Sequence, residues 1–220
     1  MTPNVLRVLA ALLCLLLVHA EVQPQKDFDL QAMAGKWYLI GFATNAPWFV
    51  SKKAEMKMGT AVLKPTADGN LDMSYSSLNS DGSCWRMSHL AKKSDIPGKF
   101  TFRSQRWGND NDMRVVDVKS DEFALVHTIK TKGGVSTVLN KLYGRTTDVG
   151  QDIMDKFRKL SVETGVLPEN IVILPKNGRP SPSRHIHYGH RGPWVAQHST
   201  LFCFSYPLQG NALPHKRFQT

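Results

Sequence analysis

Short segments rich in β-branched, aromatic and Met residues follow one another from Lys36 to Lys141. Turn residues separate them at intervals of about 8 to 12 residues, a spacing typical of an antiparallel β domain. Asp81-Gly82 and Gly133-Gly134 supply the positive φ angles of tight hairpins, and Asn109-Asp110-Asn111-Asp112 is expected to form a further turn. The pattern predicts eight strands, over residues 37–44, 56–64, 71–78, 85–91, 100–107, 113–118, 123–131 and 135–145.

The periodicity becomes helical after the eighth strand, with apolar residues at offsets of four and three from Ile153. Thr147 or Asp148 is expected to cap this helix and Gly165 to end it, and a ninth short strand is predicted at 170–174. Sequential hairpins with one late helix predict an all-β fold: a closed, eight-stranded, antiparallel up-and-down β-barrel with one C-terminal α-helix packed outside. Such a barrel is wide enough for about one small ligand.

The basic charge of the chain is unevenly distributed. The 28 Lys and Arg exceed the 18 Asp and Glu by ten. Residues 177–220 hold five of these basic residues and no acidic residue, and Arg7 lies in the first twenty residues. Residues 21–176 therefore carry a net charge of only +4, and no nucleic-acid partner is predicted.

The two ends of the chain differ from its middle. Residues 1–20 combine one Arg, an apolar run from Val8 to Val18 and small residues before Glu21, as in a secretory signal peptide. The run is too short to cross a membrane, so we expect a secreted, extracellular protein without a transmembrane segment. Residues 21–176 form the predicted barrel domain, and the basic, His- and Pro-rich residues 177–220 are predicted to be disordered.

Three motifs resemble signatures of the lipocalin family. They are Gly35-Lys36-Trp37-Tyr38 at the first strand, Phe123-Ala124 in the seventh, and Leu142-Tyr143-Gly144-Arg145-Thr146 before the helix. The resemblance covers residues 26–176. It implies structural roles for Gly35, for Trp37 as a plug at the closed end of the barrel, and for Arg145 as a cation–π partner across the Trp37 ring.

Within the family, residues 35–58 and 171–175 look most like the lipocalin-type prostaglandin D synthase group and its non-catalytic relatives. The enzymes of that group use a cysteine thiol on the second strand, activated in a hydroxyl-lined pocket. The matching position here is Gly59, and Leu39 and Ala61 stand where pocket hydroxyls are expected. Glycine carries no nucleophile, so a non-enzyme is predicted, with a prostaglandin D synthase-like isomerase as the alternative. No cofactor and no catalytic residue is predicted.

Alternation from Trp37 would turn Leu39 and Gly41 inward. The resemblance then suggests a mainly apolar cavity with a few polar tips, suited to a hydrophobic ligand such as a retinoid, fatty acid, bile pigment or steroid. The predicted ligand-binding residues are Leu39, Gly59, Ala61, Met73, Tyr75, Met87, His89, Phe102, Ser104, Met113, Val115, Val126 and Leu139.

Some polar residues of the barrel have two interpretations. His89 has no second catalytic group at suitable spacing, which favours a hydrogen-bonded barrel histidine over a general base. Arg103, Arg106, Lys52 and Lys53 could ring the mouth and attract a carboxylate-bearing ligand, or could form an ordinary solvated surface.

The cysteine pattern departs from the family. Cys84 stands where lipocalins place the first half of a disulfide, but the usual partner position after Leu174-Pro175 holds no Cys. Cys203 could pair with Cys84 if the C-terminal residues folded back; alternatively, a free Cys84 would favour intermolecular dimers. Monomer and dimer both stay open, and a cell-surface receptor is possible.

Residues 177–220 also suggest a third class of function, a cationic protein that binds anionic surfaces through this segment. Its His185-x-His187-x-x-His190 pattern is a weak metal-binding signal, and no metal site is predicted.

Overall fold

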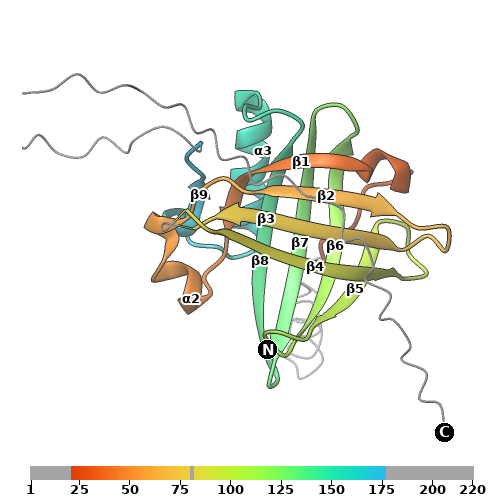
Figure 1. Ribbon diagram of the computed structural model, residues 1–220, viewed down its shortest axis with the longest axis horizontal. Coiled ribbons are helices and arrows are strands. Elements are labelled where there is room, and N and C mark those ends of the chain that lie inside the picture. The colour runs from red at the N-terminus through yellow and green to blue at the C-terminus, as the bar shows by residue number, and fades with distance from the viewer. Residues whose placement is uncertain (1–20, 80–81, 177–220) are drawn as a thin grey trace, which may run out of the picture.

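The computed structural model describes residues 21–79 and 82–176. Its eight main strands form one antiparallel sheet in chain order, and β1 pairs with both β2 and β8, which closes the barrel (Figure 1). The predicted eight-stranded up-and-down barrel is thereby confirmed. The strands are β1 (Gly35–Ala43), β2 (Thr60–Pro65), β3 (Leu71–Leu78), β4 (Cys84–Lys93), β5 (Lys99–Ser104), β6 (Asn109–Lys119), β7 (Phe123–Lys132) and β8 (Val135–Gly144).

Two strands, β2 and β6, start more than two residues away from the predicted positions, and β5 ends at Ser104 rather than at residue 107. Strand β2 begins at Thr60 rather than Met56, because the connection from β1 contains α2 (Pro47–Val50) and the 3₁₀ turn η2 (Lys53–Glu55). Residues 109–112 do not turn but open β6: Asp110 lies opposite Arg103 and forms an ion pair with it at 2.9 Å. The turn lies just before, at Gly108, whose φ is +60°.

The helix α3 (Gln151–Glu163) packs against the outside of the barrel, as predicted (Figure 1). Its Phe157 side chain is fully buried against the barrel. Its N-cap is Gly150, and neither Thr147 nor Asp148 caps it. Gly165, at φ +82°, follows the last turn as predicted, and its N–H donates to the Val162 carbonyl.

After α3, the turn η3 (Pro168–Asn170) leads into β9 (Ile171–Ile173), which pairs with β1. The register of β1 shifts between Leu39 and Gly41. A side chain at Gly41 would meet Phe157 of α3 at 2.6 Å, so this position faces the helix. The prediction that Gly41 faces the cavity is therefore wrong, because the bulge inverts the alternation that begins at Trp37.

The base of the barrel is closed by the 3₁₀ turn η1 (Leu30–Met33) and by Trp37. The Trp37 indole N–H donates to the Met33 carbonyl at 2.9 Å. Arg145 lies over the Trp37 ring, with its Cζ 3.5 Å from the centroid, and its guanidinium donates to carbonyls of Lys36 and Ala34 at 2.9 and 2.8 Å. The opposite end, which carries α2 and the β7–β8 hairpin, is the mouth.

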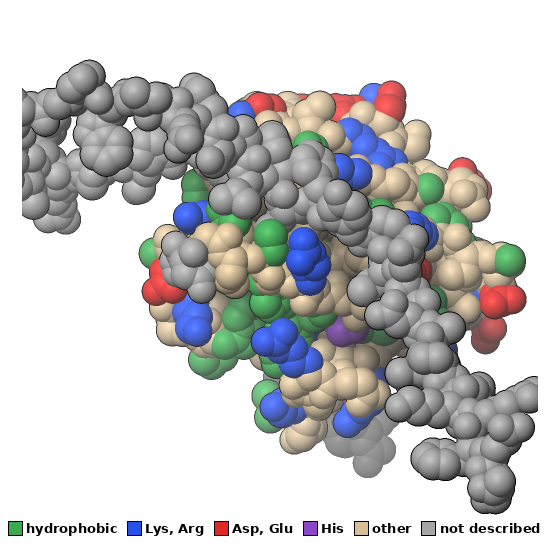
Figure 2. Space-filling view, in the orientation of Figure 1, with side chains coloured by type: hydrophobic (Ala, Val, Ile, Leu, Met, Phe, Trp, Pro, Cys, Tyr) green, Lys and Arg blue, Asp and Glu red, His purple; other side chains and the backbone are tan. Residues whose placement is uncertain are grey.

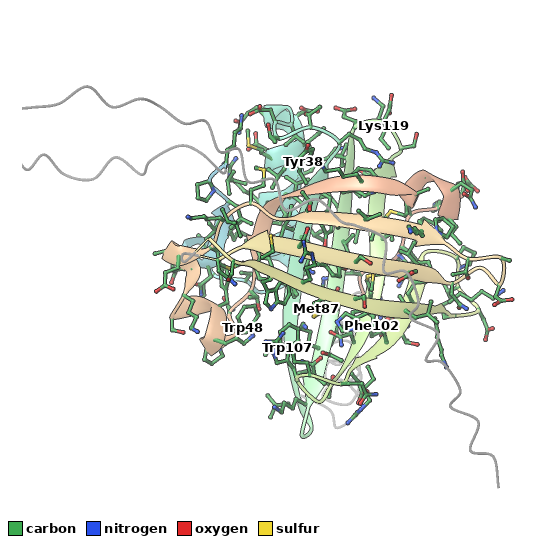
Figure 3. The ribbon with its side chains drawn as sticks, in the orientation of Figure 1. Tyr38, Trp48, Met87, Phe102, Trp107 and Lys119 are labelled. Carbon is green, nitrogen blue, oxygen red and sulfur yellow. The ribbon has the colours of Figure 1, made fainter. Side chains whose placement is uncertain are left out.

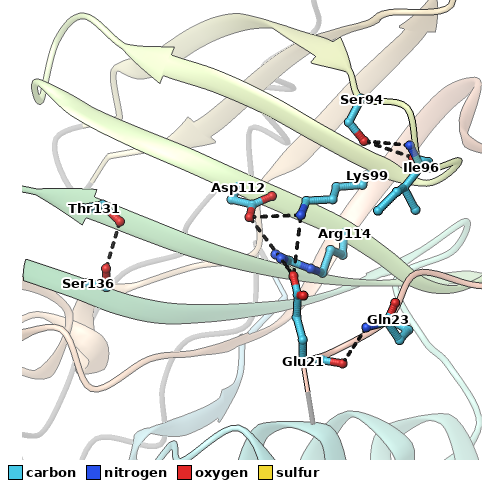
Figure 4. A network of polar contacts seen from close by, with 9 residues as sticks. All are labelled: Glu21, Gln23, Ser94, Ile96, Lys99, Asp112, Arg114, Thr131 and Ser136. Atoms are coloured by element: carbon cyan, nitrogen blue, oxygen red, sulfur yellow. Dashed lines mark hydrogen bonds and ion pairs between the residues drawn. The ribbon is translucent and has the colours of Figure 1, made fainter. Parts of the chain in front are cut away.

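An ion-pair network ties the start of the described chain to the outer wall (Figure 4). Arg114 is only 2% exposed and binds the carboxylates of Glu21 and, at 3.0 Å, Asp112. Lys99 lies 3.5 and 3.6 Å from the same two carboxylates. The hydrogen bond and charge of Arg114 lower the pKa of Glu21. None of the helices in the described part of the chain is long and apolar enough to span a membrane.

Candidate ligand-binding cavity

A cavity lies inside the barrel above the base. The atom-free space there is about 420 Å³, part of which is the open mouth, and the converging side chains leave little free room at its centre. Its wall is mainly apolar, with a few polar groups. The lining residues are Met33, Leu63, Leu71, Met73, Tyr75, Phe102, Asn111, Met113, Val126, Thr128, Lys130, Leu139, Lys141 and Tyr143.

Six of the thirteen predicted ligand-binding residues belong to this wall. They are Met73, Tyr75, Phe102, Met113, Val126 and Leu139.

The other seven predicted residues lie around the wall. Ala61 and Val115 are fully buried in the interior core. Met87 lies opposite Tyr75, and His89 opposite Met73, across the β3–β4 pair. Leu39 packs between the two cores, Ser104 is buried, and Gly59 precedes β2. None of these seven residues is part of the cavity lining.

Sequence reasoning missed the polar part of the wall. Alternation places Thr128 and Lys130 on the same side of β7 as Val126, and Lys141 on the same side of β8 as Leu139. The signal was present in the strand periodicity. The polar residues predicted to face the interior were Tyr75, His89 and Ser104, and no lysine was among them.

Two lysines project into the cavity without an acidic partner. Lys130 and Lys141 are half-buried, and neither forms an ion pair with any of the described residues. Burial, and secondly the charge of Lys130, lowers the pKa of Lys141 to about 7. Burial also lowers the pKa of Lys130. The cavity therefore holds cationic groups that lack the anion which would normally stabilise them.

Lys141 is flanked by aromatic rings. Its Nζ lies 4.8 Å from the centroid of Tyr75 and 5.9 Å from that of Phe42, its partner across β1 and β8. Phe42 in turn stacks on Phe49 of α2, with centroids 5.0 Å apart. These contacts place the Lys141 amine between Tyr75 in the barrel interior and the aromatic residues that pack on α2 at the mouth.

Two tyrosines, Tyr75 and Tyr143, line the cavity together with Lys141. The Tyr75 hydroxyl donates to the Met73 Sδ at 3.3 Å. Burial raises the pKa of Tyr75 to about 12, although a hydrogen bond with Tyr143 opposes this, and burial also raises the pKa of Tyr143. Both phenols are therefore neutral at physiological pH.

His89 packs against Phe102, with ring centroids 4.9 Å apart. Burial, followed by the charges of Lys130 and Lys141, lowers its pKa. The lowered pKa favours the neutral ring, and no carboxylate of the described residues stabilises the charged form. The ring packs on Phe102 but forms no side-chain hydrogen bond within the described residues, so the expected hydrogen-bonded histidine is not found there.

Two buried polar atoms near the cavity have no hydrogen-bond partner among the described residues. They are Asn111 Oδ1 and Ser104 Oγ. Asn111 also lines the cavity, so its carbonyl oxygen is available to a hydroxyl of a ligand.

Aromatic and basic side chains gather at the mouth. The rings of Trp85 and Trp107 stack at 6.2 Å, and Lys130 Nζ and Arg106 Cζ lie 5.8 and 5.9 Å from the Trp107 centroid. In Figure 3, Trp107 lies between Trp48 of the α2 segment and the barrel residues Met87 and Phe102. Figure 2 shows hydrophobic side chains around α2, where Trp48 is 51% exposed.

The four predicted mouth cations have different environments. Only Arg106 joins the aromatic group at the mouth. Arg103 pairs with Asp110, and Lys53 donates to the Glu169 carbonyl and the Asn170 side chain at 2.6 and 2.8 Å. Lys52 is exposed.

Gly59 lies close to the backbone of β3. A Cβ at this position would be 2.8 Å from the Ser76 carbonyl oxygen, and Leu39 N–H donates to the Gly59 carbonyl at 2.9 Å. The site thus lacks a thiol and has little room for one.

Cys84 is disulfide-bonded. It is the sole cysteine in the described ranges, and its pairing with Cys203 stays a prediction, because Cys203 lies outside them. The same ranges contain no group of three or more His, Cys, Asp or Glu placed to hold a metal ion. The His185 motif, the proposed signal peptide and the basic C-terminal residues also lie outside the described chain.

Comparison with known proteins agrees with this architecture. Residues 34–178 match the model of the lipocalin / cytosolic fatty-acid binding protein family. The chain is 42% identical over 161 residues to a protein of Rhinella marina named Lipocalin, covering 73% of this chain and 87% of the relative. It is 32% identical over 162 residues to prostaglandin-H2 D-isomerase of Canis lupus familiaris, covering 73% and 84%.

The barrel also resembles a solved structure of the siderocalin Ex-FABP, a protein described as functioning through dual ligand specificities. The TM-score is 0.58 and the sequences are 27% identical, over 66% of this chain and 95% of the other.

Proposed function

The chain belongs to the lipocalin family, whose members bind small hydrophobic ligands, and we propose that this protein is a secreted, non-catalytic carrier of a small hydrophobic molecule with an acidic head group. One observation carries the proposal: an apolar barrel cavity contains Lys130 and Lys141, and neither meets a carboxylate among the described residues. A fatty acid or an acidic retinoid has an apolar chain that suits the cavity wall and a carboxylate that suits the lysines.

The two parts of such a ligand would be held by different forces. Burial of its apolar chain contributes about 25 cal/mol per Å², before ordering costs are subtracted. A hydrogen bond between its carboxylate and a lysine contributes roughly 1.5–3 kcal/mol, because one or both partners are charged. The first force sets the overall affinity, and the second sets the preference for acids over alcohols.

The carrier proposal is favoured over an isomerase by the chemistry around Gly59. This position offers no thiol, and its neighbours Leu39 and Ala61 offer no hydroxyl to activate one. The relatives named prostaglandin-H2 D-isomerase share the family with this chain, but the residue that matches their nucleophile cannot attack an endoperoxide.

A titration of Trp fluorescence tests the carrier proposal. Hexadecanoic acid and hexadecanol share a chain and differ in the head group, and we expect the acid to bind at least about tenfold more tightly. Lys141→Met and Lys130→Met should each reduce this preference, whereas Lys159→Met, at an exposed position of α3, should retain it. Flat titrations with both lipids would overturn the carrier proposal, and equal affinities would overturn the acidic head group.

Secretion is tested separately. The N-terminus of the protein recovered from culture medium is expected to be Glu21, whose side chain binds Arg114 on the barrel wall. Retention of the protein inside the cell with residues 1–20 attached would contradict the proposal.

A further inference from the structure

We propose that Lys141 is a covalent capture site, at which hydrophobic aldehydes that enter the barrel condense with the lysine amine to form an imine. The inference rests on the proposed function in one respect, since the aldehyde must enter the same cavity as other hydrophobic molecules. It goes further by assigning a reaction to one residue of that cavity.

The position of Lys141 suits such a reaction. Its side chain lines the cavity, and its Nζ lies 4.8 Å from the Tyr75 ring and 5.9 Å from the Phe42 ring. An aldehyde whose chain fills the apolar wall would therefore bring its polar end toward an amine held among aromatic rings. Holding the two reactants together in this way raises their effective concentration.

Burial and the charge of Lys130 favour the neutral, nucleophilic form of Lys141. Lys130 faces it from β7 and His89 from β4, while Tyr75 on β3 and Tyr143 on β8 are the neighbouring phenols. None of these groups is a carboxylate, so none stabilises the ammonium by opposite charge.

The resulting difference from an ordinary lysine is large. Because the pKa of Lys141 is lowered to about 7, about half of its amines are neutral at pH 7. An exposed lysine with an ordinary pKa has roughly one neutral amine in 3,000 at that pH. A desolvated lysine beside a second cation is a recognised form of activated amine nucleophile.

Lys130 is less suited to this role, although it shares the cavity. Its Nζ lies 5.8 Å from the centroid of Trp107 at the mouth. Lys130 acts on the reaction indirectly, as a second positive charge that adds to the effect of burial in lowering the pKa of Lys141.

The chemistry requires no oxidant, reductant or metal. The Lys141 lone pair attacks the carbonyl carbon, a C–N bond forms, and a proton moves from nitrogen to oxygen to give a carbinolamine. The C–O bond then breaks, and the hydroxyl leaves as water with the second amine proton. One amine and one aldehyde thus yield one imine and one water, and the apolar cavity slows the reverse hydrolysis by limiting water.

The experiment is reductive trapping of the full-length secreted protein with decanal and sodium cyanoborohydride at pH 7, read by intact mass and peptide mapping. We expect one major adduct, at Lys141, formed at least about 100-fold faster than modification of the exposed Lys159. Lys141→Met should abolish the major adduct. Lys130→Met should slow it several-fold, because removing the neighbouring cation raises the pKa of the amine.

Decanol and decanoic acid provide the control for entry and folding. Both lipids should bind wild type, and decanol, which has no carboxylate, should also bind Lys141→Met. Decanol binding followed by Trp fluorescence thus shows that the cavity of the variant is intact without any covalent step. If the lipids bind but decanal modifies Lys130 or the surface lysines instead of Lys141, the capture inference is wrong and the carrier proposal stands. If neither lipid binds wild type, the carrier proposal itself is wrong.

Discussion

Lys141 Nζ lies 4.8 Å from the centroid of the Tyr75 ring inside the barrel. The ring face attracts an ammonium by about 1–2 kcal/mol when both are shielded from water, which favours the charged amine. Burial and the repulsion of Lys130 outweigh this attraction, since the pKa of Lys141 falls to about 7. A ligand that supplies a negative charge would reverse that balance, so binding and protonation at this residue are coupled.

The affinity for a carboxylate ligand is therefore expected to depend on pH. The bound carboxylate raises the pKa of Lys141, so the complex takes up a proton when it forms above pH 7, and affinity falls as pH rises through this range. We expect hexadecanoic acid to bind about tenfold or more weakly at pH 8.5 than at pH 6.5. Calorimetry in two buffers of different ionisation enthalpy measures both the affinity and the proton uptake. Hexadecanol and Lys141→Met serve as controls with little pH dependence, and an equally flat profile for the acid would contradict the coupling.

The same lysine should reduce the stability of the empty barrel. Between pH 7 and the ordinary lysine pKa of 10.5, the unfolded chain binds a proton that the folded chain has released, so the free energy of unfolding of the wild type rises with pH across this window. Lys141→Met removes the effect and is expected to be more stable at pH 7 by roughly 1–3 kcal/mol, a range reduced for solvent at the cavity mouth. Urea unfolding at pH 7 and pH 10 measures the difference, which should shrink at the higher pH. A variant less stable than wild type at pH 7 would show that packing of the lysine stem dominates.

Arg145 is expected to be the main polar support of the closed end. Its Cζ lies 3.5 Å from the Trp37 centroid, and its three nitrogens donate to carbonyls of separate segments, including Ser120 at 2.6 Å. Arg145→Met should lower the free energy of unfolding by about 2–4 kcal/mol, because the ring contact is lost and several acceptors lose their donor. Arg145→Lys should have an intermediate effect, since one ammonium cannot bridge all these carbonyls. Urea unfolding with the exposed Arg158→Met as control tests this, and equal effects of the two Arg→Met variants would contradict it.

The barrel could be predicted because its determinants are local. Gly133 and Gly134 adopt φ angles of +57° and +78° in the β7–β8 hairpin, as a Gly-Gly turn requires. Gly165 ends α3 at φ +82° for the same reason. Interior and exterior residues alternate along the regular parts of the strands, so the six predicted residues that lie in the cavity wall follow from periodicity and the family resemblance. Their contact with a ligand stays a prediction.

The errors arose where contacts between distant strands decide the outcome. Four consecutive Asn and Asp residues at 109–112 have the composition of a turn, but pairing with β5 extends β6 through them. The contacts across this pair include the Arg103–Asp110 ion pair and the hydrogen bond that the Asn111 amide donates to the Phe102 carbonyl. The bulge between Leu39 and Gly41 turns Gly41 toward Phe157 of α3, so this contact joins segments that are far apart in the chain. None of these contacts is visible in the local sequence.

For the lysines of the cavity, one property could be predicted from the sequence and another could not. The inward direction of Lys141 follows from its spacing of two residues from Leu139. The absence of an acidic residue near Lys141 could not be predicted in this way. It depends on which side chains β3, β4 and β7 contribute to the cavity once the barrel has closed.

The position of Gly59 leads to a final prediction, that a thiol alone does not make this protein an isomerase. A Cβ at Gly59 would lie 2.8 Å from the Ser76 carbonyl oxygen, so Gly59→Cys requires β3 to move and should cost roughly 1–3 kcal/mol of stability. Leu39 and Ala61 also supply no hydroxyl that could help to ionise the introduced thiol.

We therefore expect no conversion of prostaglandin H2 above the level of Gly59→Ser, which places a similar side chain against β3 without sulfur. Product analysis by mass spectrometry measures the conversion, and thiol titration of the folded variant shows whether the new sulfur is accessible. Conversion that exceeds the serine control and is abolished by iodoacetamide would mean that the missing sulfur is the sole barrier to catalysis. Such a result would mean that the groups next to position 59 are sufficient to activate a thiol, among them the side chain of Ser77, whose Cβ would lie 3.4 Å from the new Cβ.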